Sequence, residues 1–404
     1  MRILMIAPEP FFEPRGTPFS EFHRIRALTA LGHQVDLVTY PFGEDVSMPG
    51  LRVIRALRPP FVTRVKIGPS AAKFPLDALL TLTAFRVGLT GTYDAIHSHE
   101  EGGVIGVVLS WVLRIPHLYD MHSSLPQQLT NFAFTGSSVA RGVVRWFEKL
   151  MINQSKVVIV ICPALEDTVR ETAPAANVVL IENAPGSAED HATPEQAAAI
   201  RAHHGLAADT PLVLYTGTFE AYQGLDLLFA SMAHVKRALP AARLLLAGGK
   251  ADQVEKARAQ AAAAGIGDVT IFAGERPASE IPSYLLACDA LVSPRSRGTN
   301  TPLKIYQYLR SGKAIVATRL MTHTQVLDDE VSILTAVSPQ EYGDGILKAL
   351  NDRALAARVG ANAQRLADTK YSYEAYLDKT RRACAELFSS TTPLSPGSPV
   401  KDVA

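Results

Sequence analysis

A strand that runs into a sharply bounded helix decides the fold, in residues 290–313, ALVSPRSRGTNTPLKIYQYLRSGK. The apolar run at its start is typical of a short buried strand. Thr301 stands where a side chain caps a helix, and Pro302 suits the first helical position. Gly312 supplies the left-handed conformation that ends many helices. The stretch therefore predicts a helix whose N-terminus lies at the carboxyl end of a strand.

The same alternation of short apolar runs and helix-length segments fills the rest of the chain. Such a pattern is typical of parallel sheets with helices on both faces. We therefore expect an α/β protein with two Rossmann-like, doubly wound domains. Strands are expected, in chain order, at residues 2–7, 34–40, 95–97, 117–120, 157–162 and 178–181, and again at 212–216, 243–247, 269–272, 290–293, 314–318 and 332–335.

The length of 404 residues is more than one hydrophobic core usually supports. The stretch ENAPGSAEDHATPEQ, at residues 182–196, is rich in Pro, Gly and charge, as linkers are. We expect a first domain at 1–184, a linker and entry segment at 185–209, and a second domain at 210–370. A helix at 371–388 is expected to pack back on the first domain, and the Ser/Pro-rich tail at 389–404 to be disordered.

Composition and charge limit the class of protein and its location in the cell. The net charge of +1 provides no overall field for binding nucleic acid. The three cysteines, Cys162, Cys288 and Cys384, show no metal-ligand spacing. No run reaches the roughly 18 uncharged apolar residues of a spanning helix, and the apolar run at the N-terminus is too short for a signal peptide. We expect a cytoplasmic protein.

Ligands of open parallel sheets bind outside the carboxyl ends of the strands, so the loops that leave strands hold the candidate residues. After the first strand, Arg15 and Gly16 precede Thr17 and Pro18, which repeat the pattern of a capping residue followed by proline. The N-terminus of a helix attracts anions, although most capped helices bind nothing.

Two further loops carry histidines. HSHEEGG, at residues 97–103, holds His99 and Glu100. Its glycines resemble a dinucleotide fingerprint only weakly, because the G-x-G spacing after the first strand is missing. YDMHSSLPQQL, at residues 119–129, holds Asp120 and His122, a pair in which the carboxylate can hold the imidazole. No serine stands in a strand-turn-helix elbow, which disfavours a hydrolase. A structural role is the plainer reading of a single histidine.

The helix of the opening stretch has Lys304 one turn from its start. Helix dipole, free amides and one ammonium group together suit a diphosphate. Arg295, Arg297 and Asn300 lie in the loop before it. Lys304 alone would more often be a solvated helix residue.

Taken in order, eight segments resemble the family 4 glycosyltransferases, over about residues 1–388. The resemblance implies the GT-B fold, in which two Rossmann-like domains face each other across a cleft. It also implies transfer of a sugar from a UDP- or GDP-linked donor to a hydroxyl acceptor, with retention of configuration. No metal or other cofactor is implied, and the chain has no D-x-D loop. The segments are GTPFSEFHRIRALTALGHQVDLVTY, YDAIHSHEEGG, YDMHSSLP, VICPALEDTV, VVLIENAP, YTGTFEAYQGLDLLFASM, LLLAGG and SPRSRGTNTPLKIYQYLRSGKAIVAT.

The resemblance also assigns roles. His122 and Lys304 would be catalytic, with His122 beside the transferred sugar and Lys304 on the diphosphate. The loop 274–276 would meet the base. The acceptor side would hold Arg15, His99 and Glu100, and no residue would bind metal. The donor-binding set would be Gly16, Thr17, Gly217, Arg276, Arg295, Arg297, Asn300, Thr301, Pro302, Leu303 and Gln307.

The chain departs from the family at its E-x7-E motif. A register fixed on Gly312 places the two glutamate positions at Thr299 and Gln307. Gln307 can still bond ribose hydroxyls, at a loss on the order of 1 kcal/mol relative to a carboxylate. A basic pair near the start of the second domain is also replaced, by Thr218 or Phe219 and by Gln223, which leaves Arg295 or Arg297 as substitute cations.

Residues 51–88 are locally basic and apolar. Such a patch suits an anionic membrane surface, and a lipid-linked glycan of the cell envelope as acceptor, with the protein peripheral on the inner face of the cytoplasmic membrane. A solvated face beside an ordinary amphipathic helix fits equally well. Nucleic acid is not expected, because no binding fold for it is recognisable. The patch holds Arg52, Arg55, Arg58, Arg64, Lys66, Lys73 and Arg86 against the single acid Asp77, with interleaved Leu57, Phe61, Val62, Val65, Ile67, Phe74, Leu76, Leu79 and Leu80.

Two other classes stay open. A catalytically inactive GT-B scaffold would bind nucleotide without turnover, and the missing glutamates favour it. A GT-B nucleotide-sugar epimerase would release free nucleotide with no acceptor present. We take a retaining glycosyltransferase of polysaccharide biosynthesis as the prediction.

Overall fold

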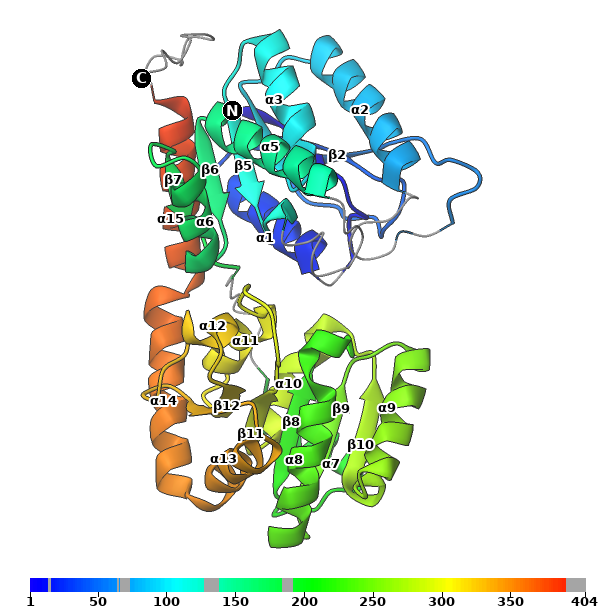
Figure 1. The fold of residues 1–404 in the computed structure, drawn as a ribbon, viewed down its shortest axis with the longest axis vertical. Coiled ribbons are helices and arrows are strands. Elements are labelled where there is room, and N and C mark those ends of the chain that lie inside the picture. Colours follow the sequence, from blue (N-terminus) through cyan, green and yellow to red (C-terminus); the bar gives the residue numbers. More distant parts are fainter. Residues whose placement is uncertain (14–15, 64, 66–72, 127–137, 184–191, 390–404) are drawn as a thin grey trace.

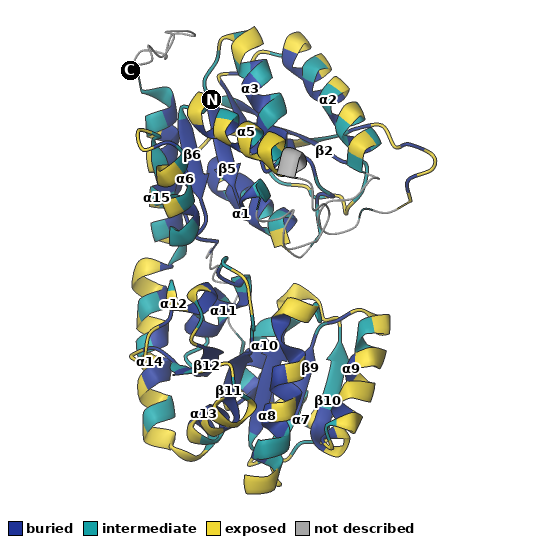
Figure 2. Ribbon diagram, in the orientation of Figure 1, coloured by how far each residue is buried: buried dark blue, intermediate teal, exposed yellow. Residues whose placement is uncertain are grey.

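Two α/β domains follow one another along the long axis of the molecule (Figure 1). The computed structural model describes residues 1–13, 16–63, 65, 73–126, 138–183 and 192–389. Each domain is built on one parallel sheet, and Figure 2 shows the central strands of both sheets buried while exposed residues gather on the outer faces of the helices. The expected fold class, two Rossmann-like domains, is confirmed.

The first domain holds a seven-stranded sheet in the order β3-β2-β1-β4-β5-β6-β7. The order reverses between β1 and β4, so the loops after these two strands diverge and leave a crevice at their carboxyl ends. Its strands are β1 (Arg2–Ala7), β2 (Gln34–Thr39), β3 (Leu51–Arg55), β4 (Ala95–His99), β5 (His117–Met121), β6 (Val157–Val160) and β7 (Val178–Leu180), and its helices α1 (Gly16–Ala30), α2 (Lys73–Thr90), α3 (Gly102–Leu113), α5 (Ser138–Gln154) and α6 (Pro163–Thr172).

The second domain holds a six-stranded sheet in the order β10-β9-β8-β11-β12-β13, which reverses between β8 and β11. Its strands are β8 (Leu212–Thr216), β9 (Arg243–Ala247), β10 (Thr270–Gly274), β11 (Ala290–Ser293), β12 (Ala314–Thr318) and β13 (Ile333–Thr335). Its helices are α7 (Pro194–His203), α8 (Leu225–Ala238), α9 (Ala251–Ala263), α10 (Ile281–Ala287), α11 (Leu303–Arg310), α12 (Met321–Thr324), α13 (Pro339–Asn351) and α14 (Arg353–Lys370).

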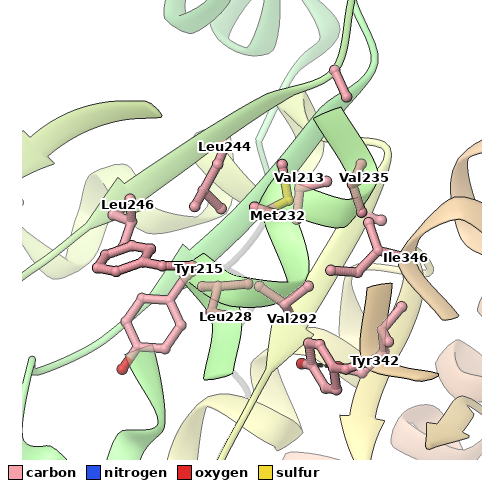
Figure 3. Close-up of a cluster of buried hydrophobic side chains, with 14 of the residues drawn as sticks. Val213, Tyr215, Leu228, Met232, Val235, Leu244, Leu246, Val292, Tyr342 and Ile346 are labelled. Carbon is pink, nitrogen blue, oxygen red and sulfur yellow. Dashed lines mark hydrogen bonds between the residues drawn. The ribbon is translucent and has the colours of Figure 1, made fainter. Parts of the chain in front are cut away.

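The core of the second domain packs aromatic and branched side chains between the sheet and its helices. Figure 3 shows Val213 and Tyr215 of β8 against Leu228 and Met232 of α8, with Tyr342 of α13 beyond them. The Tyr342 hydroxyl is buried, and it donates to the main-chain oxygen of Val316 at 2.9 Å, which satisfies the hydroxyl inside an apolar core.

The last described helix, α15 (Tyr373–Phe388), leaves the second domain and lies against the first (Figure 1). Its buried residues Tyr376 and Leu387 pack with Ala27 of α1 and Leu118 of β5. The Ser372 side chain caps its N-terminus by accepting from the amide of Ala375 at 3.1 Å. At the entry to the second domain, α7 packs on α10. The linker residues 184–191 and the tail 390–404 lie outside the described residues.

The structure corrects three local predictions. Helix α11 begins at Leu303 with Pro302 as its extended N-cap and no side-chain cap, so Thr301 does not cap it. Helix α1 begins at Gly16, so Thr17 and Pro18 lie in its first turn. Strand β3 was not predicted, because its sequence LRVIR alternates charge with half-buried residues at a sheet edge. The left-handed Gly312, at φ +67°, is confirmed. No helix among the described residues combines the length and apolar character needed to cross a bilayer.

Candidate active site

The second domain places a buried lysine at the point where its strand order reverses. Lys304 is 8% exposed, and its Nζ donates to the main-chain oxygen of Thr216, the last residue of β8, at 3.0 Å. The ammonium also lies 3.8 Å from the ring centroid of Tyr215. Burial, and then the nearby charge of Arg295, hold the pKa of Lys304 well below its usual range. Among the described residues no carboxylate pairs with it, so an anion is the partner that this cation lacks.

Glycine opens the space above the lysine. Gly217 follows β8 with φ +126°, a conformation that other residues rarely adopt. A Cβ at this position would lie 3.6 Å from the Lys304 Nζ, so the backbone of Gly217 lies close to the ammonium. Helix α11 begins beside this point without a side-chain cap, which leaves its first amides available to a ligand. Lysine, glycine and helix N-terminus thus form one anion-attracting corner.

Arg295 supports the corner from the loop after β11. Its Nη1 donates to the main-chain oxygen of Asn300 at 2.8 Å and to Oγ1 of Thr322 at 3.0 Å. Its guanidinium lies 5.1 Å from the ring of Tyr222, and burial lowers its pKa. Arg295 therefore holds the loop in shape and adds positive potential. Arg297 is exposed in the same loop.

Arg276 and Gln307 have surroundings different from those of the lysine. Arg276 is exposed, and its Nε donates to the main-chain oxygen of Glu275 at 2.9 Å. Gln307 lines a cavity of about 180 Å³ between α10, α11 and α14, which Lys304 does not line. Thr301 and Pro302 are buried, and Leu303 is half-buried.

In the first domain, Asp120 at the end of β5 is the centre of a buried polar cluster. Its Oδ2 accepts from Nε of Arg24 on α1 at 2.9 Å, and the two side chains are 0% and 1% exposed. Burial alone would raise the pKa of Asp120, but the charge of Arg24 outweighs it and holds that pKa well below its usual range. A buried, ionised carboxylate needs such a partner.

Three histidines surround this carboxylate. His97 Nε2 lies 3.3 Å from Asp120 Oδ2, and His122 Nε2 lies 3.3 Å from Asp120 Oδ1. His99 Nδ1 lies 3.2 Å from His122 Nε2, and the His97 and His99 rings are stacked. Burial lowers the pKa of His122 to about 4 and that of His99 well below its usual range, so both are neutral near pH 7.

The same groups have the spacing of a metal-ligand set. Ligand atoms of His97, His99 and Asp120 lie within 4.8 Å of one another. Arg24, however, already occupies Asp120 Oδ2, and its guanidinium would repel a cation placed there. The residues fit an ion pair better than a metal centre.

Sequence reasoning singled out Glu100 but missed two other acids of this crevice, Glu9 and Glu21. Glu21 of α1 is 0% exposed, and its Oε1 lies 3.8 Å from His99 Nδ1. Burial raises the pKa of Glu9, beside Glu21, to about 7, and that of Glu21 well above its usual range. Glu100 adopts φ +46° and accepts from Ser123 Oγ at 3.0 Å. The signal was present: Glu21 and Arg24 lie three apart on the helix face that packs inward.

Two side chains of the second domain connect the two sites. Asn300 Nδ2 donates to the main-chain oxygen of His122 at 2.7 Å. Gln325 Oε1 accepts from the amide of Ala164 at 2.8 Å. The structure thus brings the loop before α11 to the predicted His122 and places His99 and Glu100 on the same crevice. Gly16 is exposed and Thr17 half-buried at the start of α1, and Arg15 lies outside the described residues.

The basic patch at residues 51–88 is largely tied into the fold. Arg52 pairs with Asp36, and Arg55 donates to the main-chain oxygens of Phe11 and Phe42. Lys73 pairs with Glu101. Leu57, Phe61 and Phe74 remain 74%, 75% and 69% exposed. Arg64, Lys66 and Ile67 lie outside the described residues. Arg52, Arg58 and Arg86 are exposed as well, so the described part of the patch presents both basic and apolar side chains.

Family models cover both halves of the chain. A glycosyl transferase 4-like domain matches residues 23–184, and a domain of glycosyl transferases group 1 matches residues 196–366. The phosphatidyl-myo-inositol mannosyltransferase of Mycobacterium tuberculosis is 23% identical over 375 residues, which cover 89% of this chain and 90% of that protein.

Solved structures share the architecture. Sucrose-phosphate synthase of Thermosynechococcus elongatus superposes with a TM-score of 0.77 at 22% identity, over 96% of this chain and 100% of that chain. HepE of Anabaena, solved in complex with UDP-glucose, gives a TM-score of 0.72 at 18% identity, over 95% and 99%. With the family matches on both domains, the chain belongs to the family 4 glycosyltransferases of GT-B fold, and it is an enzyme of the transferase class.

Proposed function

We propose that the protein transfers a sugar from a nucleotide diphosphate sugar, UDP- or GDP-linked, to an acceptor hydroxyl, with retention of configuration. The observation that carries this proposal is Lys304, a buried ammonium without an acid partner among the described residues. A diphosphate at the uncapped start of α11 would supply the missing charge. The HepE structure contains UDP-glucose, which supports UDP as the nucleotide.

Departure of the nucleotide places negative charge on the β-phosphate in the transition state. Lys304, the amides at the start of α11 and the field of Arg295 would stabilise that charge. The low pKa of Lys304 would rise when the phosphate binds, because the anion favours the protonated amine. These groups supply the positive potential that a metal supplies in other transferases, so we infer a reaction without metal or other cofactor.

The sugar would lie between the two sites. His122 Nε2 faces Asp120 and His99, so a ligand would meet the ring at Nδ1. When Nε2 carries the proton and donates to His99 Nδ1, Nδ1 of His122 keeps its lone pair and can accept from a hydroxyl. Gln307 would bond the ribose from α11, and Arg276 would flank the base.

For the acceptor, we propose a lipid-linked glycan of polysaccharide biosynthesis. The exposed Leu57, Phe61 and Phe74 would rest on the inner face of the cytoplasmic membrane, with the protein otherwise in the cytoplasm. The mannosyltransferase relative is named for a lipid, phosphatidyl-myo-inositol. Nucleic acid has no part in the proposal.

The donor is tested by titration calorimetry with UDP, GDP, ADP and CDP, each beside its nucleoside. We expect one diphosphate to bind, and to bind at least about tenfold more tightly than its nucleoside, since each 1.4 kcal/mol is tenfold. Thermal unfolding checks the hit, because ligand at about 100 times its Kd adds roughly 2.7 kcal/mol. Folded protein that binds none of them would contradict the proposed donor.

The membrane contact is tested by sedimentation with vesicles of phosphatidylglycerol and phosphatidylcholine. Changing Leu57, Phe61 and Phe74 to serine should lower the bound fraction, because apolar area drives insertion. The matched control replaces Met321 and Val337, which are 50% and 45% exposed on the second domain. Equal binding by both variants would contradict the proposed surface.

A further inference from the structure

The two domains meet at a small polar contact beside the active site. In Figure 1 the yellow loop before α11 reaches from the second domain toward the first. In this loop the Asn300 side chain donates to the main-chain oxygen of His122, which follows β5. The Gln325 side chain donates to the main-chain oxygen of Thr299 and accepts from the amide of Ala164 at the start of α6. Both contacts use main-chain atoms of the first domain.

Asn300 is bound on two sides. Its main-chain oxygen accepts from Arg295 Nη1 at 2.8 Å and from Thr322 Oγ1 at 2.6 Å. Its side-chain Nδ2 donates to the main-chain oxygen of His122 at 2.7 Å. Asn300 thus links Arg295 of the second domain to His122 of the first.

Gln325 forms a second connection from α12. Its Oε1 accepts from the amide of Ala164 at 2.8 Å, and its Nε2 donates to the main-chain oxygen of Thr299 at 2.6 Å. The amide of Ala164 is one of the unsatisfied donors at the start of α6, so this bond costs the helix nothing. The second connection fixes the same loop, next to Asn300.

The His122 side chain depends on where its main chain lies. Its Nε2 is 3.3 Å from Asp120 Oδ1 and 3.2 Å from His99 Nδ1. A shift of the carbonyl that Asn300 holds would move the ring relative to both groups. Catalysis is sensitive to displacements of about 1 Å between reacting groups.

We propose that Asn300 is a positioning residue rather than a donor ligand. Its carboxamide ties the donor loop to His122 and sets the separation of the two halves of the active site. The proposal rests on the family's transfer reaction and on this contact, and it does not depend on which nucleotide is the donor.

The test compares Asn300→Ala and Asn300→Asp with Asn362→Ala. Aspartate keeps the shape but cannot donate, and its carboxylate would face the His122 carbonyl. The control, Asn362 on α14, also donates Nδ2 to a main-chain oxygen, that of Glu330 at 2.9 Å, but far from the site. The readouts are UDP affinity by calorimetry, the radius of gyration by small-angle scattering, and the ring resonances of His122.

We expect Asn300→Ala to keep UDP affinity within about threefold of the parent, less than one hydrogen bond to a ligand would contribute. The radius of gyration should be larger in Asn300→Asp than in Asn300→Ala. The His122 resonances should shift in both variants. Asn362→Ala should match the parent in every readout. A loss of UDP affinity of about tenfold with unchanged scattering would overturn the proposal. So would unchanged scattering and unchanged His122 resonances in both variants. If the parent does not bind UDP, that donor fails, while scattering and resonances still decide the role of Asn300.

Discussion

At the scale of single residues, the site is a set of buried charges that each depend on a partner. Asp120 has Arg24, and the surrounding histidines stay neutral. Lys304 has no carboxylate partner among the described residues, and the anion of a substrate would provide the missing counter-charge. His99, His122 and Lys304 could be singled out because each lies at the end of a strand or in the segment that leaves one. Glu21 and Arg24 share an inward helix face that the sequence could have shown, but Glu9 could not be predicted, because only tertiary packing brings it into the crevice.

Replacing Asp120 with asparagine should lower the free energy of unfolding of the first domain by roughly 3–5 kcal/mol, because Arg24 is left buried without its counter-charge. The folded pKa of Asp120 lies below the unfolded value of about 3.9. Its contribution is therefore complete above that value and lost as the pH falls through the folded pKa. Denaturant unfolding at pH 7 measures the loss caused by the substitution. Unfolding of the parent at pH 3, compared with pH 7, measures the loss caused by acidification. The control is Asp344→Asn, in an exposed pair with His234; equal losses in the two variants would contradict the argument.

The acids of the crevice should act in the opposite direction. Burial raises the folded pKa of Glu9 to about 7 and that of Glu21 well above its usual range, so the folded state binds protons more tightly. Stability is then complete below the unfolded pKa and falls as the pH rises toward the folded values. Replacing Glu21 with glutamine should flatten the loss of melting temperature between about pH 5 and pH 8. Parallel curves for parent and variant would count against a buried carboxyl pair.

At the scale of elements, the presence of strands was easier to predict than the starts of helices. Buried parallel strands are short apolar runs, and the predicted ones are all present in the structure. Helix α11 starts after an extended proline, although Thr301 and Pro302 looked like a cap and a first residue. Strand β3 was missed because an edge strand needs only half of its residues buried. Boundaries depend on backbone angles that tertiary contacts fix.

Helix α15 belongs in packing to the first domain, so a cavity in it should weaken that domain. Leu387 is 1% exposed in the cluster with Ala27 and Tyr376. Replacing it with alanine should cost about 2–5 kcal/mol. Both tryptophans of the chain, Trp111 and Trp146, lie on helices of the first domain, so their fluorescence reports its unfolding. Met321→Ala, at an exposed position of the second domain, should leave this transition unchanged. A loss seen only in the second domain would contradict the assignment.

At the scale of the whole molecule, two Rossmann-like sheets direct the carboxyl ends of their central strands toward a shared site. The strand order reverses between β1 and β4 and between β8 and β11. The crevice acids lie beside the first reversal point and Lys304 lies beside the second, where ligands of such sheets bind. Figure 1 shows α14 beside the second domain and α15 beside the first. The sequence could predict two domains, but not the contact of Asn300 with His122, because no local pattern records how domains face each other.

A ligand held mainly by the second domain should stabilise that domain selectively. Unfolding followed by circular dichroism reports both domains, whereas tryptophan fluorescence reports the first. UDP at about 100 times its Kd should add roughly 2.7 kcal/mol to the transition of the second domain. The fluorescence transition should move less. A shift confined to the fluorescence transition would indicate that the nucleotide binds the first domain, which would contradict the prediction.

The central claim is that Lys304 holds the diphosphate, and titration of Lys304→Ala with UDP and with uridine tests it most directly. The exposed Lys348 on α13 gives the matched control, Lys348→Ala. We predict that Lys304→Ala loses at least about tenfold in affinity for UDP and keeps its affinity for uridine, while Lys348→Ala matches the parent for both. Equal losses for UDP and uridine in Lys304→Ala, or no loss for either, would contradict the claim.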